Sequence, residues 1–369
     1  MDKNISKESR INWIDELKGF ILILVCLGHT NINIPFIGGN LIVICQAFRM
    51  STFFFLSGLL FSTRRYSDIH SYIKSKTKVL LIPYILLSIL FSFLDPRLYD
   101  LSLMEKYNFL NIIYDSSDIN TSFDFFICGF ISIFYYGIPM TASPLWFVLT
   151  LYFVSIFFYV IHDVFKGNII IIVVYAVVCL IIGWLLNLYN LCLPYCFSTV
   201  FTASFFFTAG YLTKKRIKYI TGLNKLKLAV IIIFLIAIYF YAININGGIS
   251  LNFNKLGNNF WGYILSTISG IFLISSIFIF INKLVKDSIV QGTLRNIARN
   301  ALIILSVHYW VIICCRIFFS SIAKETYFPW LVTFIMIIVT TLAIPLFRTK
   351  LYKLIGKNKI SFKESLSIK

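Results

Sequence analysis

The sequence predicts an all-α, polytopic membrane protein with about ten transmembrane helices and with both termini in the cytoplasm. Of its 369 residues, 59% are hydrophobic and only 13% are charged, whereas soluble domains are about 45–50% apolar and about 25% charged. The mean hydropathy is +0.86 over the whole length. Apolar windows of roughly 17–23 residues, long enough to cross about 30 Å of hydrocarbon, recur throughout the chain. These observations exclude a soluble enzyme with a single anchor helix.

The predicted spans follow one another along the whole chain. The first runs into HTNINIPF (29–36) without a small-residue cleavage site, so we expect it to be retained and not removed as a signal peptide. A shorter apolar segment, 122–139, contains Asp124 and is expected to form an amphipathic or re-entrant piece at the outer face. We place the ten spans near residues 14–33, 40–61, 79–94, 145–162, 168–187, 195–213, 228–245, 260–281, 300–321 and 328–347.

The excess of cations indicates the orientation of the chain. There are 33 Lys and Arg against 15 Asp and Glu, a formal net charge of +18. In a soluble protein this charge would indicate a nucleic-acid partner, but in a membrane protein cations gather in cytoplasmic loops. With ten spans and a cytoplasmic N-terminus most cations fall inside, whereas an eleventh span at 122–139 would place KKRIKYITGLNKLK (214–227) outside. We expect a lipid bilayer and no nucleic acid as partner.

No internal repeat and no linker divides the chain, so a single domain over residues 1–369 is predicted. Its core is expected at 11–348, and residues 349–369 are expected to form a basic cytoplasmic tail. The eight cysteines lie in or beside apolar segments, with no C-x-x-C pair and no histidine at ligand spacing. They indicate buried side chains and neither a disulfide framework nor a metal site.

The first span contains three ionisable residues, Asp15, Lys18 and His29. Eleven residues separate Lys18 from His29, so an α-helix places both on one face, about 16 Å apart along its axis. Asp15 lies one turn before Lys18 and can pair with it. One interpretation is that Asp15 and Lys18 extend to the cytoplasmic surface while His29 caps the outer end. The other, which we favour for His29 because an unbroken apolar run precedes it, is that it accepts a proton.

Two later spans also contain ionisable residues, and each of these is costly in hydrocarbon. Arg49 lies eight or nine residues in from the outer end of the second span, where a guanidinium needs a carboxylate, a water-filled cavity or an anionic ligand. His308 and Arg316 lie in the ninth span. His308 is either a core histidine that is satisfied near Ser306 or a residue that contacts substrate. We treat Arg49, His308 and Arg316 as candidate substrate contacts.

The predicted cytoplasmic loop 62–78 contains five cations, which reflect either the positive-inside bias or a phosphate-binding patch. They are Arg64, Arg65, Lys74, Lys76 and Lys78. The chain contains no glycine-rich nucleotide loop, no G-x-S-x-G and no H-E-x-x-H, so hydrolase chemistry of the soluble type has no support. Ten spans with buried ionisable residues would also suit a transporter or flippase for an anionic glycolipid, or a non-catalytic membrane domain.

Six segments in order resemble the acyltransferase 3 family of bacterial integral-membrane acyltransferases, in particular its sugar O-acetylase and fucose 4-O-acetylase-like branch. In that family the first span has a cation, ten residues and then a histidine, as Lys18 and His29 do here. Three features differ from the family. Its first-span cation is often Arg, and its second span often has His-Met-Pro where this chain has Arg49-Met50-Ser51. Many relatives also have a pair of arginines just before the third span, where this chain has Lys74, Lys76 and Lys78. The six segments are WIDELKGFILILVCLGHT (13–30), FRMSTFFFLSGLLF (48–61), KVLLIPYILL (78–87), SPLWFVLTLYFV (143–154), FFFTAGYLTKK (205–215) and ARNALIILSVHYWVI (298–312).

The resemblance implies a membrane O-acyltransferase in the bacterial inner (cytoplasmic) membrane. It implies transfer of acetyl from cytoplasmic acetyl-CoA, a co-substrate and not a permanently bound cofactor, to a hydroxyl of a cell-surface polysaccharide or lipid-linked sugar such as an O-antigen or capsule unit. His29 would be the general base or acyl-handling residue, and Lys18 and Asp15 would orient or polarise the cytoplasmic end of the same face. The cations before the third span, Lys74 and Lys78 with Arg64 and Arg65, would bind the CoA phosphates.

Overall fold

The computed structural model is almost entirely α-helical in the part of the chain that it describes. It describes residues 11–30, 34–36, 39–64, 66–100, 121–140 and 143–359. Within these residues the only strands, β1 (Pro35–Phe36) and β2 (Gly39–Asn40), form an antiparallel hairpin between the first two helices. The predicted all-α class is confirmed for the described residues.

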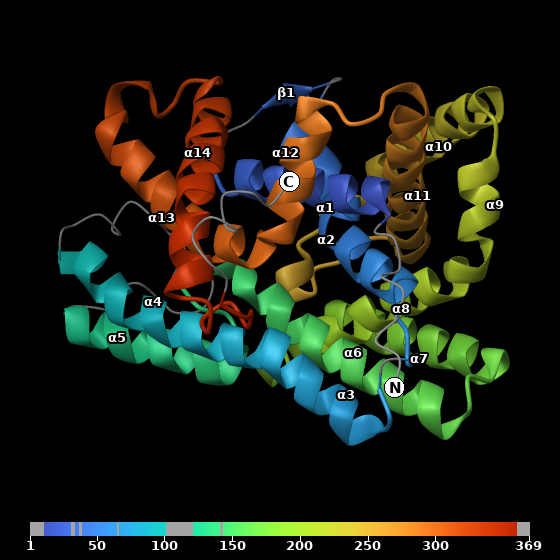
Figure 1. Cartoon of the computed structure of the whole chain (residues 1–369), viewed down its shortest axis with the longest axis horizontal. Helices are drawn as coiled ribbons and strands as arrows, with labels where there is room; N and C mark the ends of the chain where they lie inside the picture. Colours follow the sequence, from blue (N-terminus) through green and yellow to red (C-terminus); the bar gives the residue numbers. More distant parts are fainter. Residues whose placement is uncertain are drawn as a thin grey trace.

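The helices are numbered in chain order (Figure 1). Two short π-helical turns, η1 (Thr77–Leu81) and η4 (Ser132–Tyr136), interrupt or end the α-helices beside them. The α-helices are α1 (Asn12–Gly28), α2 (Leu41–Leu59), α3 (Ile69–Lys76), α4 (Ile82–Asp100), α5 (Ser122–Ile131), α6 (Trp146–Val164), α7 (Ile169–Leu188), α8 (Phe197–Thr213), α9 (Ile217–Gly222), α10 (Lys225–Asn246), α11 (Phe260–Leu284), α12 (Ile289–Arg299), α13 (Ala301–Phe318) and α14 (Phe328–Thr349).

Nine helical segments in the described residues are long and apolar enough to cross a membrane. Each overlaps one of the predicted spans, from the second to the tenth, so the chain is a multi-pass membrane protein. The side of the membrane on which each terminus lies stays a prediction. The nine segments are Leu41–Leu59, Ile69–Arg97, Ser143–Val164, Ile169–Leu188, Pro194–Gly222, Lys225–Asn246, Phe260–Leu284, Ala301–Phe318 and Phe328–Thr349.

The remaining predicted span, the first (14–33), corresponds to α1, which is shorter than the prediction. α1 has 17 residues, which is about 25 Å of helix and slightly less than the roughly 30 Å of a hydrocarbon core. It ends at Gly28, and residues 31–33 lie outside the described residues. Ten spans therefore remain a prediction, although α1 is helical and buried along most of its length as expected.

Part of the segment predicted as a cytoplasmic loop, 62–78, is helical, which corrects the prediction. Asp68 begins α3 by accepting a hydrogen bond from the backbone N–H of Ser71 at 2.7 Å, and the hydroxyl of Ser71 accepts one in return from the N–H of Asp68. This capping box satisfies N–H groups that a helix start leaves without partners. The same bond holds the pKa of the exposed Asp68 carboxyl below its usual value. The helix then continues through η1 into α4.

The short apolar segment predicted at 122–139 forms α5 and η4. α5 has 10 residues and η4 has 5. Together they form about 22 Å of helix, which is too short to cross the hydrocarbon core. α5 packs beside α4, where the rings of Phe93 and Phe126 are 5.3 Å apart (Figure 1). The segment is therefore a short helix that does not span the membrane, and its amphipathic or re-entrant character and its place at the outer face stay predictions.

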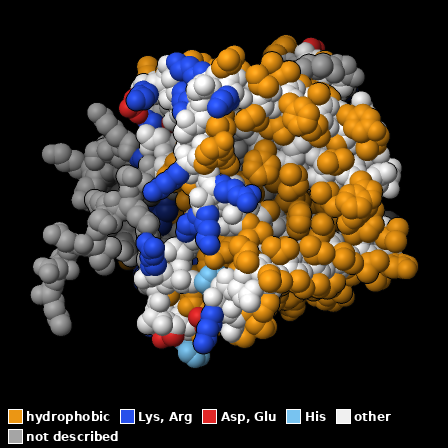
Figure 2. All heavy atoms as spheres, turned by 90° about the vertical axis from the view of Figure 1, so that its right-hand side faces the viewer, with side chains coloured by type: hydrophobic (Ala, Val, Ile, Leu, Met, Phe, Trp, Pro, Cys, Tyr) orange, Lys and Arg blue, Asp and Glu red, His pale blue; other side chains and the backbone are white. Residues whose placement is uncertain are grey.

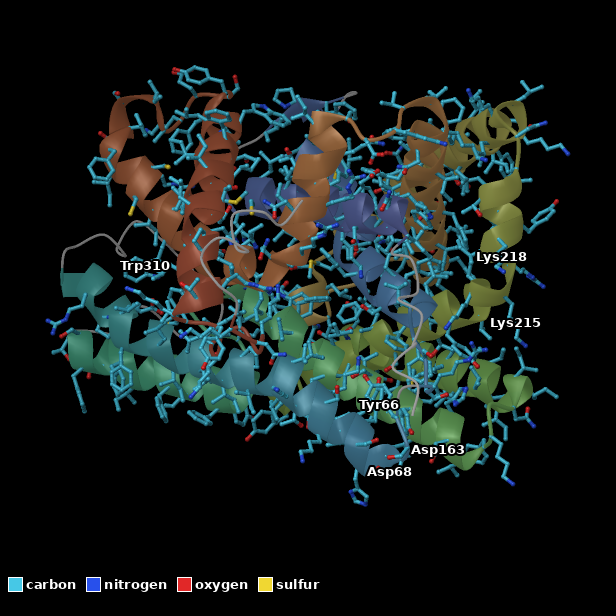
Figure 3. The ribbon with its side chains drawn as sticks, in the orientation of Figure 1. Tyr66, Asp68, Asp163, Lys215, Lys218 and Trp310 are labelled. Atoms are coloured by element: carbon cyan, nitrogen blue, oxygen red, sulfur yellow. The ribbon has the colours of Figure 1, made fainter. Side chains whose placement is uncertain are left out.

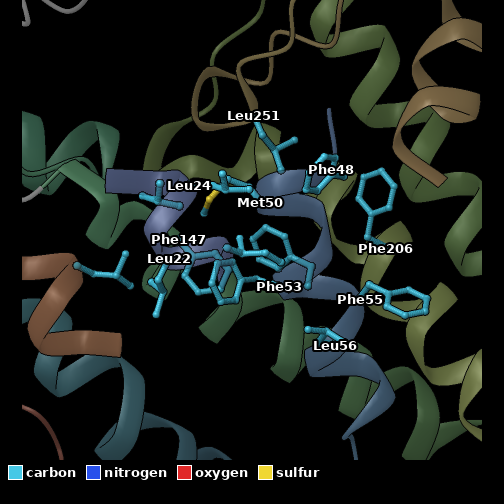
Figure 4. Close-up of a cluster of buried hydrophobic side chains, with 14 of the residues drawn as sticks. Leu22, Leu24, Phe48, Met50, Phe53, Phe55, Leu56, Phe147, Phe206 and Leu251 are labelled. Carbon is cyan, nitrogen blue, oxygen red and sulfur yellow. The ribbon is translucent and has the colours of Figure 1, made fainter. Parts of the chain in front are cut away.

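The core is densest where α2 crosses its neighbours. Gly58 of α2 and Gly210 of α8 allow the two backbones to touch, since a Cβ on Gly58 would lie 1.8 Å from the carbonyl oxygen of Phe207. Small residues of this kind let membrane helices approach closely. Phenylalanines fill the adjoining space, and Phe53 and Phe54 both pack on Phe147 of α6. Figure 4 shows this cluster with side chains from α1, α2, α6 and α8.

Large apolar side chains also cover much of the outer surface. On α10, for example, Ile233 is 68% exposed and Phe234 is 65% exposed. Figure 2 shows hydrophobic side chains over a broad part of one face, with Lys and Arg gathered in a separate band beside them. A soluble protein rarely exposes so large an apolar area. The arrangement fits a chain that is surrounded by lipid on this part of its surface.

Three connections that the charge pattern assigns to the cytoplasm lie together. The ammonium of Lys214, which follows α8, donates to the carbonyl oxygen of Phe61, which follows α2. His162, near the end of α6, lies 3.0 Å from the hydroxyl of Tyr211. Figure 3 shows Asp163 near Asp68, far from Trp310 of α13. Their common location agrees with the prediction that these loops share one side of the membrane.

The predicted basic tail packs against the rest of the chain in its described part, residues 350–359. Ile355 is buried, and a Cβ on Gly356 would lie 2.6 Å from the carbonyl oxygen of Lys78. The ammonium of Lys357 donates to the carbonyl oxygen of Arg299, at 2.6 Å, where α12 ends. Residues 360–369 of the tail lie outside the described residues.

Candidate active site

His29 lies at the C-terminal end of α1, where it is the capping residue and is partly buried. Its Nδ1 is 2.8 Å from the hydroxyl of Tyr309 in α13. The rings of His29 and Tyr309 are 4.7 Å apart, and the ring of His308 lies 5.3 Å from that of His29. Since Nδ1 is occupied by the tyrosine hydroxyl, Nε2 of His29 is the ring nitrogen left for other chemistry.

His308 is fully buried in α13, and only one of its ring nitrogens has a hydrogen-bond partner among the described residues. Nδ1 lies 2.8 Å from the carbonyl oxygen of Ile304. A carbonyl can only accept, so Nδ1 carries the proton and, in the neutral ring, Nε2 has the lone pair. The hydroxyl of Ser306 donates instead to Ile303. His308 is therefore only half satisfied, and not by Ser306 as one interpretation of the sequence expected.

The guanidinium of Arg49, in α2, also lies at the C-terminal end of α1, next to the residues that surround His29. Its Nη1 donates to the carbonyl oxygen of Leu24 in α1 at 3.0 Å. The guanidinium lies directly against Gly28, the residue before His29, since a Cβ there would be 2.0 Å from Nη1. Its Nε is buried and has no hydrogen-bond partner among the described residues. Arg49 thus supplies a fixed positive charge next to the end of α1.

Arg316 closes the group from the second half of α13. Its Nη2 donates to the carbonyl oxygen of Thr30, and the hydroxyl of Thr30 donates to Leu27 at 2.7 Å. Arg316 therefore contacts the turn that contains His29. The structure brings together His29 with all three candidate substrate contacts, although they come from α1, α2 and α13.

The other end of α1 has a different arrangement. Lys18 is partly buried and lies within electrostatic reach of Lys76 at the end of α3. The ammonium of Lys76 is 5.2 Å from the centre of the ring of Tyr72. Tyr72 is itself buried and stacks on Tyr159 of α6 with ring centroids 4.2 Å apart. Tyr72 thus positions Lys76, whose charge acts on that of Lys18 at this end of the helix.

The described cations that the resemblance assigned to the CoA phosphates are more exposed than Lys18 and Lys76. Lys74, Lys78 and Arg64 are exposed. Lys74 and Lys76 are two residues apart on a helix, about 200° around its axis, so they face nearly opposite directions. Arg65 lies outside the described residues. Of the described cations in this segment, Lys76 is the one with a resolved electrostatic interaction with Lys18.

The carboxylate buried in α1 is Glu16, which the sequence analysis did not single out. Glu16 is fully buried, and one of its oxygens lies 3.0 Å from Nη1 of Arg295 in α12. Asn282 of α11 donates to the other oxygen. Arg295 also pairs with Asp287 at 3.0 Å. Asp15, expected to pair with Lys18, is only partly buried, and the ion pair that joins α1 to α12 is made by Glu16.

Sequence reasoning missed Tyr309 as well as Glu16. Tyr309 follows His308 directly, but the chain has 21 tyrosines, and none carries a signal that separates a site residue from packing. Only the position of α13 beside α1 identifies it. In the described part of the chain, no three His, Cys, Asp or Glu side chains lie close enough together to hold a metal ion.

Comparison with known proteins gives one match. The family model Acyl_transf_3, described as an acyltransferase domain, matches residues 11–348. This range contains every residue of the two groups at the ends of α1. No curated protein and no solved structure matches the chain.

Proposed function

We propose that this chain, which belongs to the acyltransferase 3 family, transfers an acetyl group from acetyl-CoA to a hydroxyl group of a cell-surface polysaccharide or a lipid-linked sugar. The family and the apolar helices make it a membrane acyltransferase. The acetyl donor, the glycan acceptor such as an O-antigen or capsule unit, and the bacterial inner membrane as location belong to the proposal.

His29 is the proposed general base. A sugar hydroxyl is a weak nucleophile until a base removes its proton. When Nδ1–H of His29 donates to the oxygen of Tyr309, 2.8 Å away, Nε2 holds the lone pair that takes this proton. Tyr309 thereby fixes the tautomer and the orientation of the ring. His308, with its own lone pair at Nε2, lies beside it as a second proton acceptor.

Lys18 and Lys76 are the proposed contacts of the CoA phosphates. Two ammonium groups held close together attract an anion, and lysine is a common phosphate ligand. Lys74, Lys78 and Arg64 are exposed nearby on the same segment and add to the positive potential. The acyl end of the donor then extends along α1 towards His29, about 16 Å away along the helix axis.

One observation supports this proposal most strongly. His29, at the end of an apolar helix, is hydrogen-bonded to Tyr309 and lies 5.3 Å from a second histidine that has a buried nitrogen without a partner among the described residues. A purely structural histidine would be expected to have both nitrogens satisfied in a buried site, because each unsatisfied group is costly.

The decisive experiment compares the O-acetyl content of surface polysaccharide by NMR in cells with and without the gene. Cells are complemented with the wild-type chain, with His29→Ala, or with the matched control His70→Ala, since His70 is exposed and outside the site. We expect wild type and His70→Ala to restore acetylation and His29→Ala to fail while still accumulating in the membrane. Loss of polymer with unchanged acetylation of the remainder would contradict the proposal and favour transport.

A further inference from the structure

Like Arg316, Arg49 is a cation inside a candidate membrane span. It lies in α2, a predicted membrane span, and its guanidinium is inserted against the last turn of α1. No carboxylate of the described residues lies within pairing distance of Arg49. A guanidinium in an apolar segment is costly to bury, and its retention here requires a reason.

The position of the guanidinium is fixed by two contacts on α1. Nη1 donates to the carbonyl oxygen of Leu24 at 3.0 Å. The absence of a side chain at Gly28 leaves the space that the group occupies, because a Cβ there would lie 2.0 Å from Nη1 and 3.0 Å from Cζ. Both contacts belong to the turn that presents His29. The guanidinium of Arg49 and the imidazole of His29 are thus both held against the C-terminal end of α1.

One donor of this fixed group has no acceptor among the described residues. Nε of Arg49 is buried there without a hydrogen-bond partner. The groups that interact with its charge include Cys26, His29, His308 and Tyr309, none of which is a carboxylate. A preorganised N–H donor with a positive charge beside a general base is the arrangement that stabilises negative charge as it develops on a carbonyl oxygen.

We propose that Arg49 is the oxyanion donor of this acyltransferase: its Nε–H and its charge stabilise the negatively charged oxygen of the tetrahedral intermediate that forms next to His29. The inference rests on the proposed function and adds a catalytic residue to it. Arg49 stands where the related sequences often have His in His-Met-Pro, so the assignment comes from its geometry in this chain.

The oxygen of the acceptor hydroxyl forms a bond to the acyl carbon, and its proton passes to Nε2 of His29. The electron pair of the C=O bond moves to the carbonyl oxygen, where Arg49 stabilises it. The C=O bond then reforms, the C–S bond breaks, and the leaving CoA thiolate takes the proton from His29. The products are the O-acetyl ester and CoA with a free thiol.

The test measures transfer of radiolabelled acetyl-CoA to the endogenous glycan in membrane vesicles, with acetyl-CoA as the varied substrate. For Arg49→Gln we expect kcat to fall about 10²- to 10³-fold, as for the loss of one oxyanion donor, with KM for acetyl-CoA within about threefold. Arg49→Lys keeps a charge but loses the fixed Nε–H, and we expect it to remain at least about tenfold below wild type in kcat. Arg216→Gln, an exposed arginine outside the site, is the matched control and is expected to equal wild type.

A second variant tests the same role without removing the arginine. In Gly28→Ala the new Cβ displaces the guanidinium, so kcat should fall while KM changes little. This variant and Arg49→Lys decide the question if Arg49→Gln does not accumulate in the membrane on immunoblots. A rise in KM with kcat retained would assign Arg49 to substrate binding and overturn the proposal, as would wild-type kinetics in both. Wild-type vesicles without transfer, in contrast, would overturn the proposed function itself.

Discussion

At the N-terminal end of α1, the buried charge of Glu16 is neutralised by Arg295, whereas at the C-terminal end His29 and Arg49 are held by a hydroxyl group and a backbone carbonyl. The first arrangement satisfies the charge that burial would otherwise penalise. The second fixes the side chains but leaves Nε of Arg49 and Nε2 of His308 without partners among the described residues. The paired charges thus hold the N-terminal end of α1 in place, whereas the incompletely satisfied groups are the ones to which we assign the proposed chemistry.

The largest expected effect is at the C-terminal end. His29→Ala removes the proposed general base, and we expect the proposed acetyl transfer to fall by about 10²- to 10⁴-fold or more. Because His29 is only partly buried and forms one hydrogen bond there, the thermal unfolding midpoint in detergent should change little. A fully active His29→Ala protein would contradict the role of His29. Loss of activity through unfolding would contradict the proposed difference between the two ends of α1.

The second effect is at the N-terminal end. Glu16→Ala leaves Arg295 without its buried partner, and breaking such a pair costs about 3–5 kcal/mol of stability. We therefore expect a clearly lower unfolding midpoint and less protein in the membrane, but an unchanged rate per folded molecule. Asp287→Ala removes only the exposed partner of Arg295 and serves as the control, with an expected loss of at most about 1 kcal/mol. Equal losses in the two variants would show that the buried pair has no special weight.

A smaller effect is expected at Tyr309. Tyr309→Phe keeps the ring beside His29 and removes the hydroxyl that contacts Nδ1. The loss of one hydrogen bond, about 0.5–1.5 kcal/mol, corresponds to roughly a 2- to 13-fold lower kcat. Kinetics in vesicles, with a pH profile for each protein, measures this change. If Tyr309 fixes the tautomer, the profile should shift in addition; an unaltered rate and profile would remove it from the site.

The smallest effect concerns the donor phosphates. Lys76→Gln removes the cation beside Lys18, and we expect KM for acetyl-CoA to rise several-fold with kcat retained. Lys74→Gln, at an exposed position, should raise KM less, and the difference between these two lysines should diminish at high salt. A larger increase in KM for Lys74→Gln than for Lys76→Gln would favour Lys74 as the phosphate contact, as the family resemblance implies, and would contradict the role of Lys76.

Much of the fold could be predicted, because a membrane span is a local property of the sequence. An apolar window of sufficient length has no stable alternative to a helix in lipid. The start of α3 at Asp68 was missed because it depends on a capping box in a polar segment, which hydropathy does not detect. The end of α1 was placed too late because hydropathy does not detect the turn at His29 and Thr30, where the helix ends.

The site could be predicted in its members but not in its assembly. His29, Arg49, His308 and Arg316 each stood out because an ionisable group in an apolar segment is costly. Nothing in the sequence places His29 beside a residue 280 positions later in the chain. Lys76 and Lys74 could not be distinguished from the sequence because they lie on different faces of a helix, α3, where a loop was expected. Glu16 was overlooked because the argument that ionisable residues in the first span need a partner was applied only to its neighbours Asp15 and Lys18.

The central claim, that the two ends of α1 divide chemistry from stability, is tested most directly by the rate of acetyl transfer per folded molecule. The rate is measured for His29→Ala and Glu16→Ala in the same vesicles, with the folded fraction taken from the thermal unfolding curve. The account predicts that His29→Ala is folded and inactive, whereas Glu16→Ala is less stable but turns over at the wild-type rate for each folded molecule. A His29→Ala protein with the wild-type rate, or a fully folded Glu16→Ala protein without activity, would contradict it.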